Sequence, residues 1–489
     1  MPPTSSSAAG GDVDAVVVGA GHNGLVAAAV LADAGWDVLV LEAQPDPGGA
    51  VRSAELIPGY ISDLYSAFYP MTLASPAMGA LHLEDTACAG RTLRPWSDTP
   101  EADRTMMHPS STAIPPRPLL SWRAITAATA TTGGLVELWN TIKAPLLDTL
   151  FSPFPPLRAP IQLLRKLGTA EALRLARLLM LPATVMGEQL FDGDAARLLL
   201  LGNALHADTP IDAPGSGVMG FLLVMLAQDS GFPVPVGGAG QLTAALVKRA
   251  RSAGAQLQCC REVSAIDVRG GRAVAVHTRD GGTVRVRRAV VADVSAPSLY
   301  ERLLPFHLGH PGGQGELRAG RADPVALKSL KGSHGLIRWL ADLNTATIPD
   351  HPFLLFGQMS TADPSRSPAG TESAWAYTHL PREHNHDGSA DRLAQSVDQV
   401  LEEHAPGFGS HVVGGWCSAR RTYNRPTQTC AAERSMAAPP NCSNNSSSDH
   451  HPVSGAPRRR SPTCSSEVPR PTPAGVCTGY VATTAPTLR

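Results

Sequence analysis

The chain has 489 residues and a formal net charge of −1 at pH 7, and this length accommodates two or three domains with a large core. The near-neutral charge provides no global field for nucleic acid or for anionic membranes, so nucleic-acid binding is not expected. No uncharged apolar run reaches the roughly 18 residues of a transmembrane helix, and the first residues lack the basic start and apolar core of a secretory signal. These features predict a cytoplasmic protein without a transmembrane segment.

A βαβ unit follows a short leader, residues 1–12, that we expect to be disordered. Ala15–Val18 is an apolar run suited to a buried parallel strand. Leu25–Ala34 is rich in alanine and predicts a helix, and Val38–Leu41 predicts the second strand of the unit.

The turn between the first strand and the helix has the pattern G-x-G-x-x-G, formed by Gly19, Gly21 and Gly24. Gly19 permits the tight turn, Gly21 lets backbone N–H groups approach a pyrophosphate, and Gly24 lets the helix pack on the strand. The helix N-terminus would then face the phosphates. Glu42 ends the second strand, where a carboxylate can accept both ribose hydroxyls and would repel a 2′-phosphate. The spacing predicts FAD or NAD rather than NADP; a plain βαβ turn without a ligand is the alternative.

A second glycine element, PGGAVR, follows Glu42 and contains Gly48, Gly49 and Arg52. Its small residues allow another backbone approach to a diphosphate, and Arg52 can supply positive charge. Together with the preceding sequence GAGHNGLVAAAVLA, this stretch resembles the flavin-containing amine oxidase and phytoene desaturase superfamily. It looks most like the phytoene-dehydrogenase-like branch, also labelled pyridine nucleotide-disulfide oxidoreductase domain proteins. The resemblance implies FAD, bound in an extended form.

The fold class implied by the resemblance is α/β, with a Rossmann-like FAD-binding domain of the GR2 type and an inserted α+β substrate domain. The FAD-binding domain is expected in two parts, 13–75 and 231–300. Residues 76–230 are expected to form a mainly helical substrate or cap region, and 301–414 the second part of the substrate domain. Helices are predicted at Glu137–Leu150, Ile161–Leu181 and Asp194–Ala204.

The apolar composition of the helical insert predicts an apolar small-molecule substrate, and a structural cap without ligand contact is the alternative. A lipid-like substrate is compatible with peripheral membrane contact, although no basic amphipathic helix is expected to support it. The sequence does not specify the oligomeric state.

Downstream of the insert, the GG-x-x-x-L pattern at Gly237–Leu242 resembles the segment with which the family returns to the flavin domain. Val263 lies in a strand expected over Leu257–Ile266, where the resemblance implies a backbone contact with the adenine; an ordinary strand residue is the alternative. No catalytic residue is assigned. No HExxH, CxxC or Ser–His–Asp pattern supports zinc, dithiol or hydrolytic chemistry, so no metal is expected. His22 is expected to pack locally.

The range Gly415–Arg489 lacks the apolar periodicity of the preceding chain and is expected to be an irregular, disordered tail. Read in the neighbouring frame it allows RVVLGPP, then GGAINGGTAQLQQQL and DLFLGSAAAHPGGGVHGVRG. These strings are similar to the closing motifs of the phytoene-dehydrogenase-like family, so a frameshift near Gly414–Gly415 is predicted. Thr472–Gly479 would then replace the family's HPGGGVHG, and part of the flavin floor would be missing.

The leading prediction is an FAD-dependent oxidoreductase, phytoene dehydrogenase-like, that passes a hydride from an apolar substrate to flavin N5. Two alternatives stay open. One is a nucleotide-binding protein that catalyses nothing, and the other is an inactive frameshift product without its C-terminal flavin-binding segment.

Overall fold

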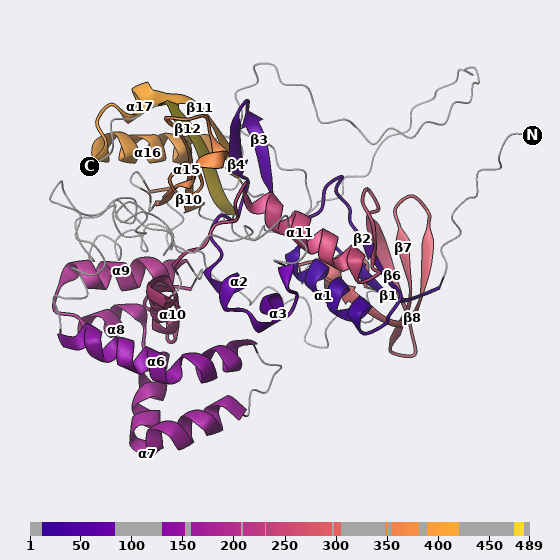
Figure 1. Cartoon of the computed structure of the whole chain (residues 1–489), viewed down its shortest axis with the longest axis horizontal. Coiled ribbons are helices and arrows are strands. Elements are labelled where there is room, and N and C mark those ends of the chain that lie inside the picture. The colour runs from indigo at the N-terminus through magenta and orange to yellow at the C-terminus, as the bar shows by residue number, and fades with distance from the viewer. Residues whose placement is uncertain are drawn as a thin grey trace, which may run out of the picture.

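A computed structural model describes residues 12–83, 130–151, 158–206, 209–229, 231–295, 298–304, 348–349, 352, 354–380, 389–419 and 474–483. These residues form three parts, visible in Figure 1: a parallel-sheet domain, a group of helices, and an antiparallel sheet with its own helix. The predicted leader lies almost wholly outside the described residues, as does most of the range after Ala419.

The first part is built on a six-stranded sheet with the order β5-β2-β1-β8-β7-β6. Its strands are β1 (Val13–Val18), β2 (Val38–Leu41), β5 (Gln256–Gln258), β6 (Val263–Arg269), β7 (Arg272–Thr278) and β8 (Thr283–Ala292). β1 runs parallel to β2 and β8, and Val16 pairs with both Leu39 and Val290. β1 and β2 are apolar along most of their length because helices or strands cover both faces of this part of the sheet.

One face of this sheet is covered by α1 (His22–Asp33) and α11 (Ala239–Ser252). Leu25 of α1 and Leu242 of α11 lie in the same core cluster, each 1% exposed. Together with the parallel β1–β2 pairing, this arrangement confirms the predicted α/β fold class.

The single strand expected over Leu257–Ile266 is wrong, because β5 ends at Gln258 and β6 begins at Val263. The intervening bend is fixed by the end of β2: the N–H of Cys260 donates to the carbonyl oxygen of Gln44 (3.1 Å), and the N–H of Arg261 donates to that of Glu42 (2.7 Å). The chain therefore turns where it passes the end of a neighbouring strand.

The helical part packs around Trp139 and Phe221, whose rings meet edge to face. Its helices are α6 (Ala130–Phe151), α7 (Arg158–Met180), α8 (Ala183–Leu190), α9 (Asp194–Leu205) and α10 (Ser216–Asp229). The short α2 (Pro70–Ala74) and α3 (Pro76–Gly79) lead toward it. α9 and α10 approach closely, because a Cβ at Gly220 would lie 2.6 Å from the carbonyl oxygen of Leu200.

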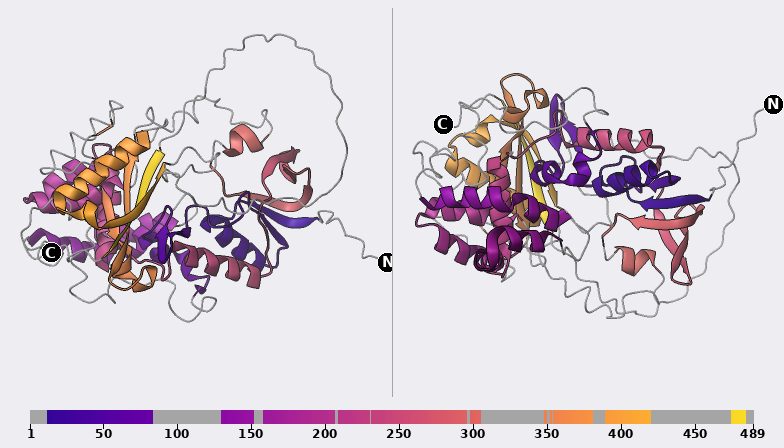
Figure 2. Two further views of the ribbon diagram at one scale, coloured as in Figure 1. Left: turned by 90° about the horizontal axis from the view of Figure 1, so that it is seen from above. Right: turned by 60° about the horizontal axis from the view of Figure 1, so that its bottom comes forward.

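The third part is a four-stranded antiparallel sheet with the order β11-β12-β10-β9 (Figure 2). It contains β9 (Leu355–Gln358), β10 (Thr371–Leu380), β11 (Val412–Ala419) and β12 (Ala474–Thr483). α16 (Ser389–His404) packs its Val397 and Leu401 into a cluster with residues of β9 and β10, and α17 (Phe408–His411) follows. The hairpin of β3 (Ser53–Ile57) and β4 (Tyr60–Asp63) lies between this sheet and α11.

The expectation of an irregular chain from Gly415 onward is wrong for two stretches, 415–419 and 474–483, which are strands. The second has the sequence AGVCTGYVAT, rich in the β-branched and aromatic residues that favour extended backbone. It occupies the middle of the antiparallel sheet, between β11 and β10. The ranges 420–473 and 484–489 lie outside the described residues.

Candidate functional site

The two glycine elements predicted to hold a diphosphate lie against each other at the N-terminus of α1. Gly21 and Gly48 form an isolated parallel β-bridge, and the N–H of Gly48 donates to the carbonyl oxygen of Ala20 (2.8 Å). A Cβ on Gly49 would lie 3.3 Å from the Cα of Gly21. The structure thus brings together two backbone segments that the sequence identified separately, and α1 has no acidic side chain in its first turn.

Asp293, directly after β8, packs beneath the first glycine loop. Its Oδ2 accepts the N–H of Gly24 (2.9 Å) and would lie 2.5 Å from a Cβ at Gly21. Gly19, with φ +98°, would bring a Cβ within 2.5 Å of the Asp293 carbonyl oxygen. The glycines are therefore required by Asp293 as well as by any phosphate. Sequence analysis did not assign Asp293; the signal was its place at the end of a strand parallel to β1.

Glu42 lies at the end of β2, as predicted, and is 9% exposed. Its Oε2 accepts the N–H of Ala20 (2.7 Å), and its Oε1 accepts the N–H of Gln44 (2.8 Å). This carboxylate joins the first glycine loop to the segment that leads to the second. Each carboxylate oxygen can accept a further hydrogen bond, so a ribose hydroxyl could be bound in addition.

Two other predicted residues lie at the margins of this arrangement. Arg52 precedes β3 and is half-buried, and its Cγ would lie 2.9 Å from a Cβ at Gly48. Val263 is the first residue of β6, and its buried side chain packs in the core beneath the sheet with Leu41. Val263 therefore has the surroundings of an ordinary strand residue, and its adenine contact stays a prediction.

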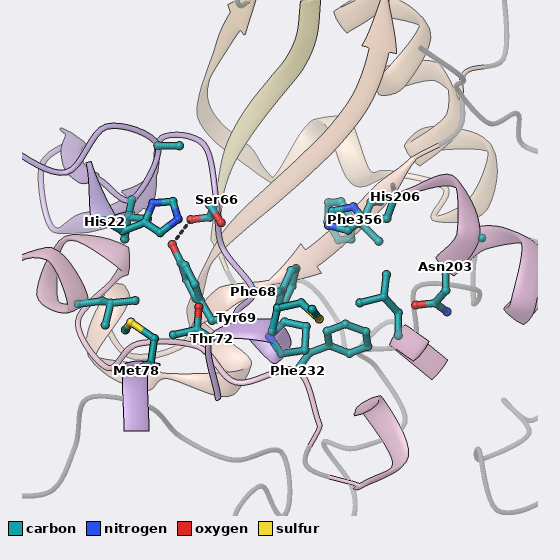
Figure 3. Close-up of a pocket in the computed structure, with 18 residues that line it drawn as sticks. His22, Ser66, Phe68, Tyr69, Thr72, Met78, Asn203, His206, Phe232 and Phe356 are labelled. Carbon is teal, nitrogen blue, oxygen red and sulfur yellow. Dashed lines mark hydrogen bonds between the residues drawn. The ribbon is translucent and has the colours of Figure 1, made fainter. Parts of the chain in front are cut away.

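A cavity of about 270 Å³ extends from the glycine loops to the helical part (Figure 3). Its glycine-loop end is lined by His22, Ala50 and Val51, and its far end by Gly202 and Asn203 of α9. Most of the remaining wall is aromatic or aliphatic and comes from segments far apart in sequence: Phe68, Tyr69, Met71, Met78, Leu223, Phe232, Leu242, Leu355 and Phe356.

Polar side chains occur at a few points of this cavity. Burial lowers the pKa of His22 below 6.5, opposed by the nearby carboxylate of Asp293. The Tyr69 hydroxyl donates to the carbonyl oxygen of Ser66 (2.8 Å), and burial raises the pKa of Tyr69. His22 was expected to pack locally; the structure also places it in the cavity wall, which the motif alone does not show.

A buried ionic network, the Arg366 junction, joins the first and third parts. Arg366 ends η5 (Pro364–Arg366) and is fully buried. Its Nη1 lies 2.5 Å from Asp63 Oδ2, and its Nε lies 3.2 Å from Asp363 Oδ2. The N–H groups of Ala239 and Gly237 donate to Asp63 Oδ1 (2.7 Å) and Asp363 Oδ2 (2.6 Å). The start of α11 is thus held by both carboxylates.

Burial alone would raise the pKa of Asp363, but hydrogen bonds from Ser365 and Gly237 and the charge of Arg366 lower it on balance. Among the described residues, no cluster of three or more His, Cys, Asp or Glu side chains could hold a metal ion. In the same part of the chain, no helix is both long and apolar enough to cross a bilayer.

The geometry fits a dinucleotide with a diphosphate and a bulky ring system. Gly21 and Gly48 present backbone at a helix N-terminus, where phosphates bind. Glu42 supplies an acceptor at the end of β2, and the cavity begins beside the same loops. The fold and the site together define a dinucleotide-binding protein in which two glycine-containing backbone segments meet at a helix N-terminus.

Comparison with known families agrees. Residues 24–312, more than half of the chain, match the family described as flavin containing amine oxidoreductase, and the chain belongs to that family. Membership of this family gives the chain FAD as its cofactor.

Similar proteins include the rat pyridine nucleotide-disulfide oxidoreductase domain-containing protein 2, 28% identical over 59% of this chain and 54% of the relative. A subunit of the limonene dehydrogenase of Castellaniella defragrans is 41% identical over 75 residues, 15% of this chain and 14% of the relative. A Pyrococcus furiosus crystal structure has 13% identity and a TM-score of 0.46, covering 80% of this chain and 84% of that one. The chain spans about half the length of the curated relatives it matches.

Proposed function

We propose that this protein is an FAD-dependent oxidoreductase of the phytoene dehydrogenase-like type, which oxidises an apolar small molecule. The cavity carries the proposal, because it begins at the glycine loops and continues between largely apolar walls into the helical part. When bound, FAD supplies a hydride acceptor at N5. The apolar wall would hold a C–H bond of the substrate and keep water out.

The residues of the chain would divide these tasks. Gly21 and Gly48 would admit the diphosphate to the N-terminus of α1, and Glu42 would accept a ribose hydroxyl. Phe68, Phe232 and the neighbouring aliphatic side chains would bind the substrate by apolar contact. Because the flavin accepts the hydride, this assignment requires no acid or nucleophile among the residues of the chain.

The proposed substrate class is supported by the name of a similar protein as well as by the lining of the cavity. The limonene dehydrogenase is named for a hydrocarbon substrate, and its subunit is similar to this chain over a short stretch. An apolar substrate of terpenoid or lipid type would be recognised by shape and burial. Asn203, at the α9 end, would bind any single polar group that such a molecule carries.

Filling the far end of the cavity tests this assignment. A Cβ at Gly202 would meet no heavy atom within 4 Å, so Gly202→Phe can project into the cavity without disturbing the helix backbone. The FAD-loaded protein should lose its visible flavin absorbance when mixed anaerobically with a terpenoid substrate. Gly202→Phe should retain FAD but be reduced roughly 100-fold more slowly, as expected for a blocked apolar pocket.

Gly193→Phe is the matched control, because a Cβ there also meets nothing within 4 Å and Gly193 does not line the cavity. Equal reduction rates for both variants would overturn the placement of the substrate. A flavin that no apolar compound reduces would overturn the substrate class and favour the alternative of a nucleotide-binding protein that catalyses nothing.

We also propose that Gly415–Arg489 arises from a reading-frame shift near Gly414–Gly415. The recovered strings of the neighbouring frame support it, and β12 would then be an out-of-frame segment that happens to have strand-forming residues. Resequencing the codons of His411–Trp416 tests the proposal. If resequencing finds an extra or missing base, the corrected frame contains the family's closing motif. A protein made in that frame should then bind FAD more tightly than the present chain. An unchanged sequence with full FAD retention would contradict both statements.

A further inference from the structure

We propose that the outer face of α7 binds the surface of an anionic lipid bilayer. This outer face is defined by Ile161, Leu164, Leu173 and Met180, which are 48%, 47%, 66% and 64% exposed. The described residues expose few other large apolar side chains, and all four of these belong to α7. Isolated exposed leucines are ordinary, but α7 exposes two pairs of large apolar side chains, one pair on each side of its break at Gly168, and we take the two pairs together as a binding surface.

Each half of α7 packs one side against the helical part. Leu163, Leu167 and Leu175 pack into or against the core of the helical part. On the opposite side Leu173 and Met180 are two turns apart, so they lie one above the other. Ile161 and Leu164 are neighbours in the same sense on the first half of the helix, before the break at Gly168, where φ is 76° and ψ is 167°.

The charged residues of α7 itself are mostly positive, which favours an anionic occupant over the alternatives. The α7 sequence, RAPIQLLRKLGTAEALRLARLLM, contains five basic residues and one acidic residue, in a chain whose net charge is −1. Arg174 pairs with that acidic residue, Glu171, and Arg177 donates to Gln189 (2.9 Å). Arg165, one turn after Ile161 on the same side of the helix, is exposed. An apolar face bordered by arginine and lysine suits anionic lipid, because the acyl region accepts the leucines and the headgroups accept the charges.

The position of α7 connects this surface to the cavity. Figures 1 and 2 place α6 and α7 at the edge of the helical part, away from the parallel sheet. α10 packs against α7, and Leu223 of α10 lines the cavity. A bilayer bound at the outer face of α7 would lie against the outside of the helical part, with α7 and α10 between it and the cavity. That arrangement suits a substrate dissolved in the membrane, and in this respect the inference rests on the proposed function.

Vesicle flotation of the full-length, FAD-loaded protein tests the surface independently of any substrate. We expect binding to vesicles of phosphatidylcholine with phosphatidylserine, and little binding to phosphatidylcholine alone. The triple variant Arg165→Gln/Arg174→Gln/Arg177→Gln should partition roughly 100-fold more weakly, from the loss of three basic contacts. The variant Leu164→Gln/Leu173→Gln should also bind at least about tenfold more weakly, since it removes the apolar anchors.

Val30→Gln is the matched control, because Val30 is 51% exposed on α1, in the parallel-sheet domain. It should bind vesicles like the parent protein, and the flavin absorbance should show that every variant retains FAD. Vesicle binding that is equal for neutral and anionic lipid, or unchanged in both α7 variants, would overturn the proposal. A leucine variant that converts a dimer to a monomer in sedimentation, with no vesicle binding by the parent, would assign the face to a second copy instead.

Discussion

Carboxylates brace the glycine loops and the Arg366 junction by different means. At the loops, Glu42 and Asp293 accept hydrogen bonds from the backbone N–H groups of Ala20, Gln44 and Gly24. At the junction, the two carboxylates accept backbone N–H groups at the start of α11 and also meet the fully buried guanidinium of Arg366. The first arrangement shapes a loop that a ligand approaches, and the second joins two parts of the protein.

The difference has an energetic meaning. A carboxylate bound by N–H groups keeps its negative charge without a cation, so its removal affects mainly the local loop. A buried arginine between two carboxylates leaves uncompensated charge when it is removed, so its loss affects the whole fold. We therefore expect variants at the junction to change stability and variants at the loops to change flavin binding.

The largest expected effect is at the junction. Arg366→Met should lower the free energy of unfolding by about 3–5 kcal/mol, because two buried carboxylates lose their shared cation. Chemical denaturation followed by circular dichroism would measure it. Arg174→Met is the control: Arg174 and Glu171 are both exposed, and that pair should contribute less than about 1 kcal/mol. A similar effect for both variants would remove the distinction between the two regions.

Gly21→Val should abolish flavin retention. The added side chain would meet Asp293 Oδ2 at 2.5 Å and close the approach to the loop, and we expect affinity to fall at least about 100-fold. The ratio of flavin to protein absorbance after gel filtration reports the loss. Gly193→Val, at an open and extended position, should keep its flavin. If Gly21→Val retained FAD, the diphosphate would have to bind elsewhere.

Glu42→Gln tests whether the Glu42 carboxylate at the same loop acts mainly on flavin binding, in contrast to the Arg366 junction. An amide offers one acceptor oxygen, so the N–H of Ala20 or Gln44 would face an NH₂ group, at a cost of about 1–3 kcal/mol. FAD affinity should fall roughly 10- to 100-fold, measured by flavin fluorescence, with a smaller change in unfolding. Glu137→Gln, on the exposed side of α6, is the control. A loss of stability as large as that of Arg366→Met would show that the loop is also a structural junction.

The smallest expected effect concerns His22, whose pKa burial holds below 6.5. As the pH falls through 6.5, the unfolded chain takes up a proton that the folded chain does not, so the free energy of unfolding decreases. His22→Gln should remove this decrease, which amounts to about 1.4 kcal/mol for each unit of pKa shift. Denaturation midpoints at about pH 7.5 and about pH 5.5 test it. Identical pH dependence in both proteins would mean that His22 titrates normally.

Local pattern predicted the parallel-sheet domain well. The strand and helix at Ala15–Val18 and Leu25–Ala34 correspond to β1 and α1, and Val38–Leu41 is β2. Such elements are predictable because apolar residues recur with a different period in a strand and in a helix. The glycines between them occur at the spacing that the strand-to-helix turn requires. The bend between β5 and β6 was not predictable, since it depends on hydrogen bonds to the end of β2.

The site was predicted only where its residues are close in sequence. Gly19, Gly21, Gly24 and Glu42 belong to one motif, whereas Asp293 reaches the same loop from a strand much later in the chain. Arg366 and Asp63 are likewise far apart in sequence, and neither belongs to a motif. The helix predicted at Ile161–Leu181 corresponds to α7, but the prediction that no basic amphipathic helix supports membrane contact is opposed by the outer face proposed for α7. Which leucines stay exposed depends on the helices packed against the other side.

Because β1 pairs with β8, a strand much later in the chain, the sheet around β1 can be completed only late in synthesis. β1 can pair with β2 soon after both leave the ribosome, but β8, its neighbour on the other side, is complete only when Ala292 has been added. At the usual rate of translation, this interval lasts on the order of tens of seconds. Throughout it, one edge of an almost entirely apolar strand is open while the helices α6–α10 emerge. Newly made chains should therefore depend on chaperones most during this interval, because an open apolar strand edge is where aggregation begins.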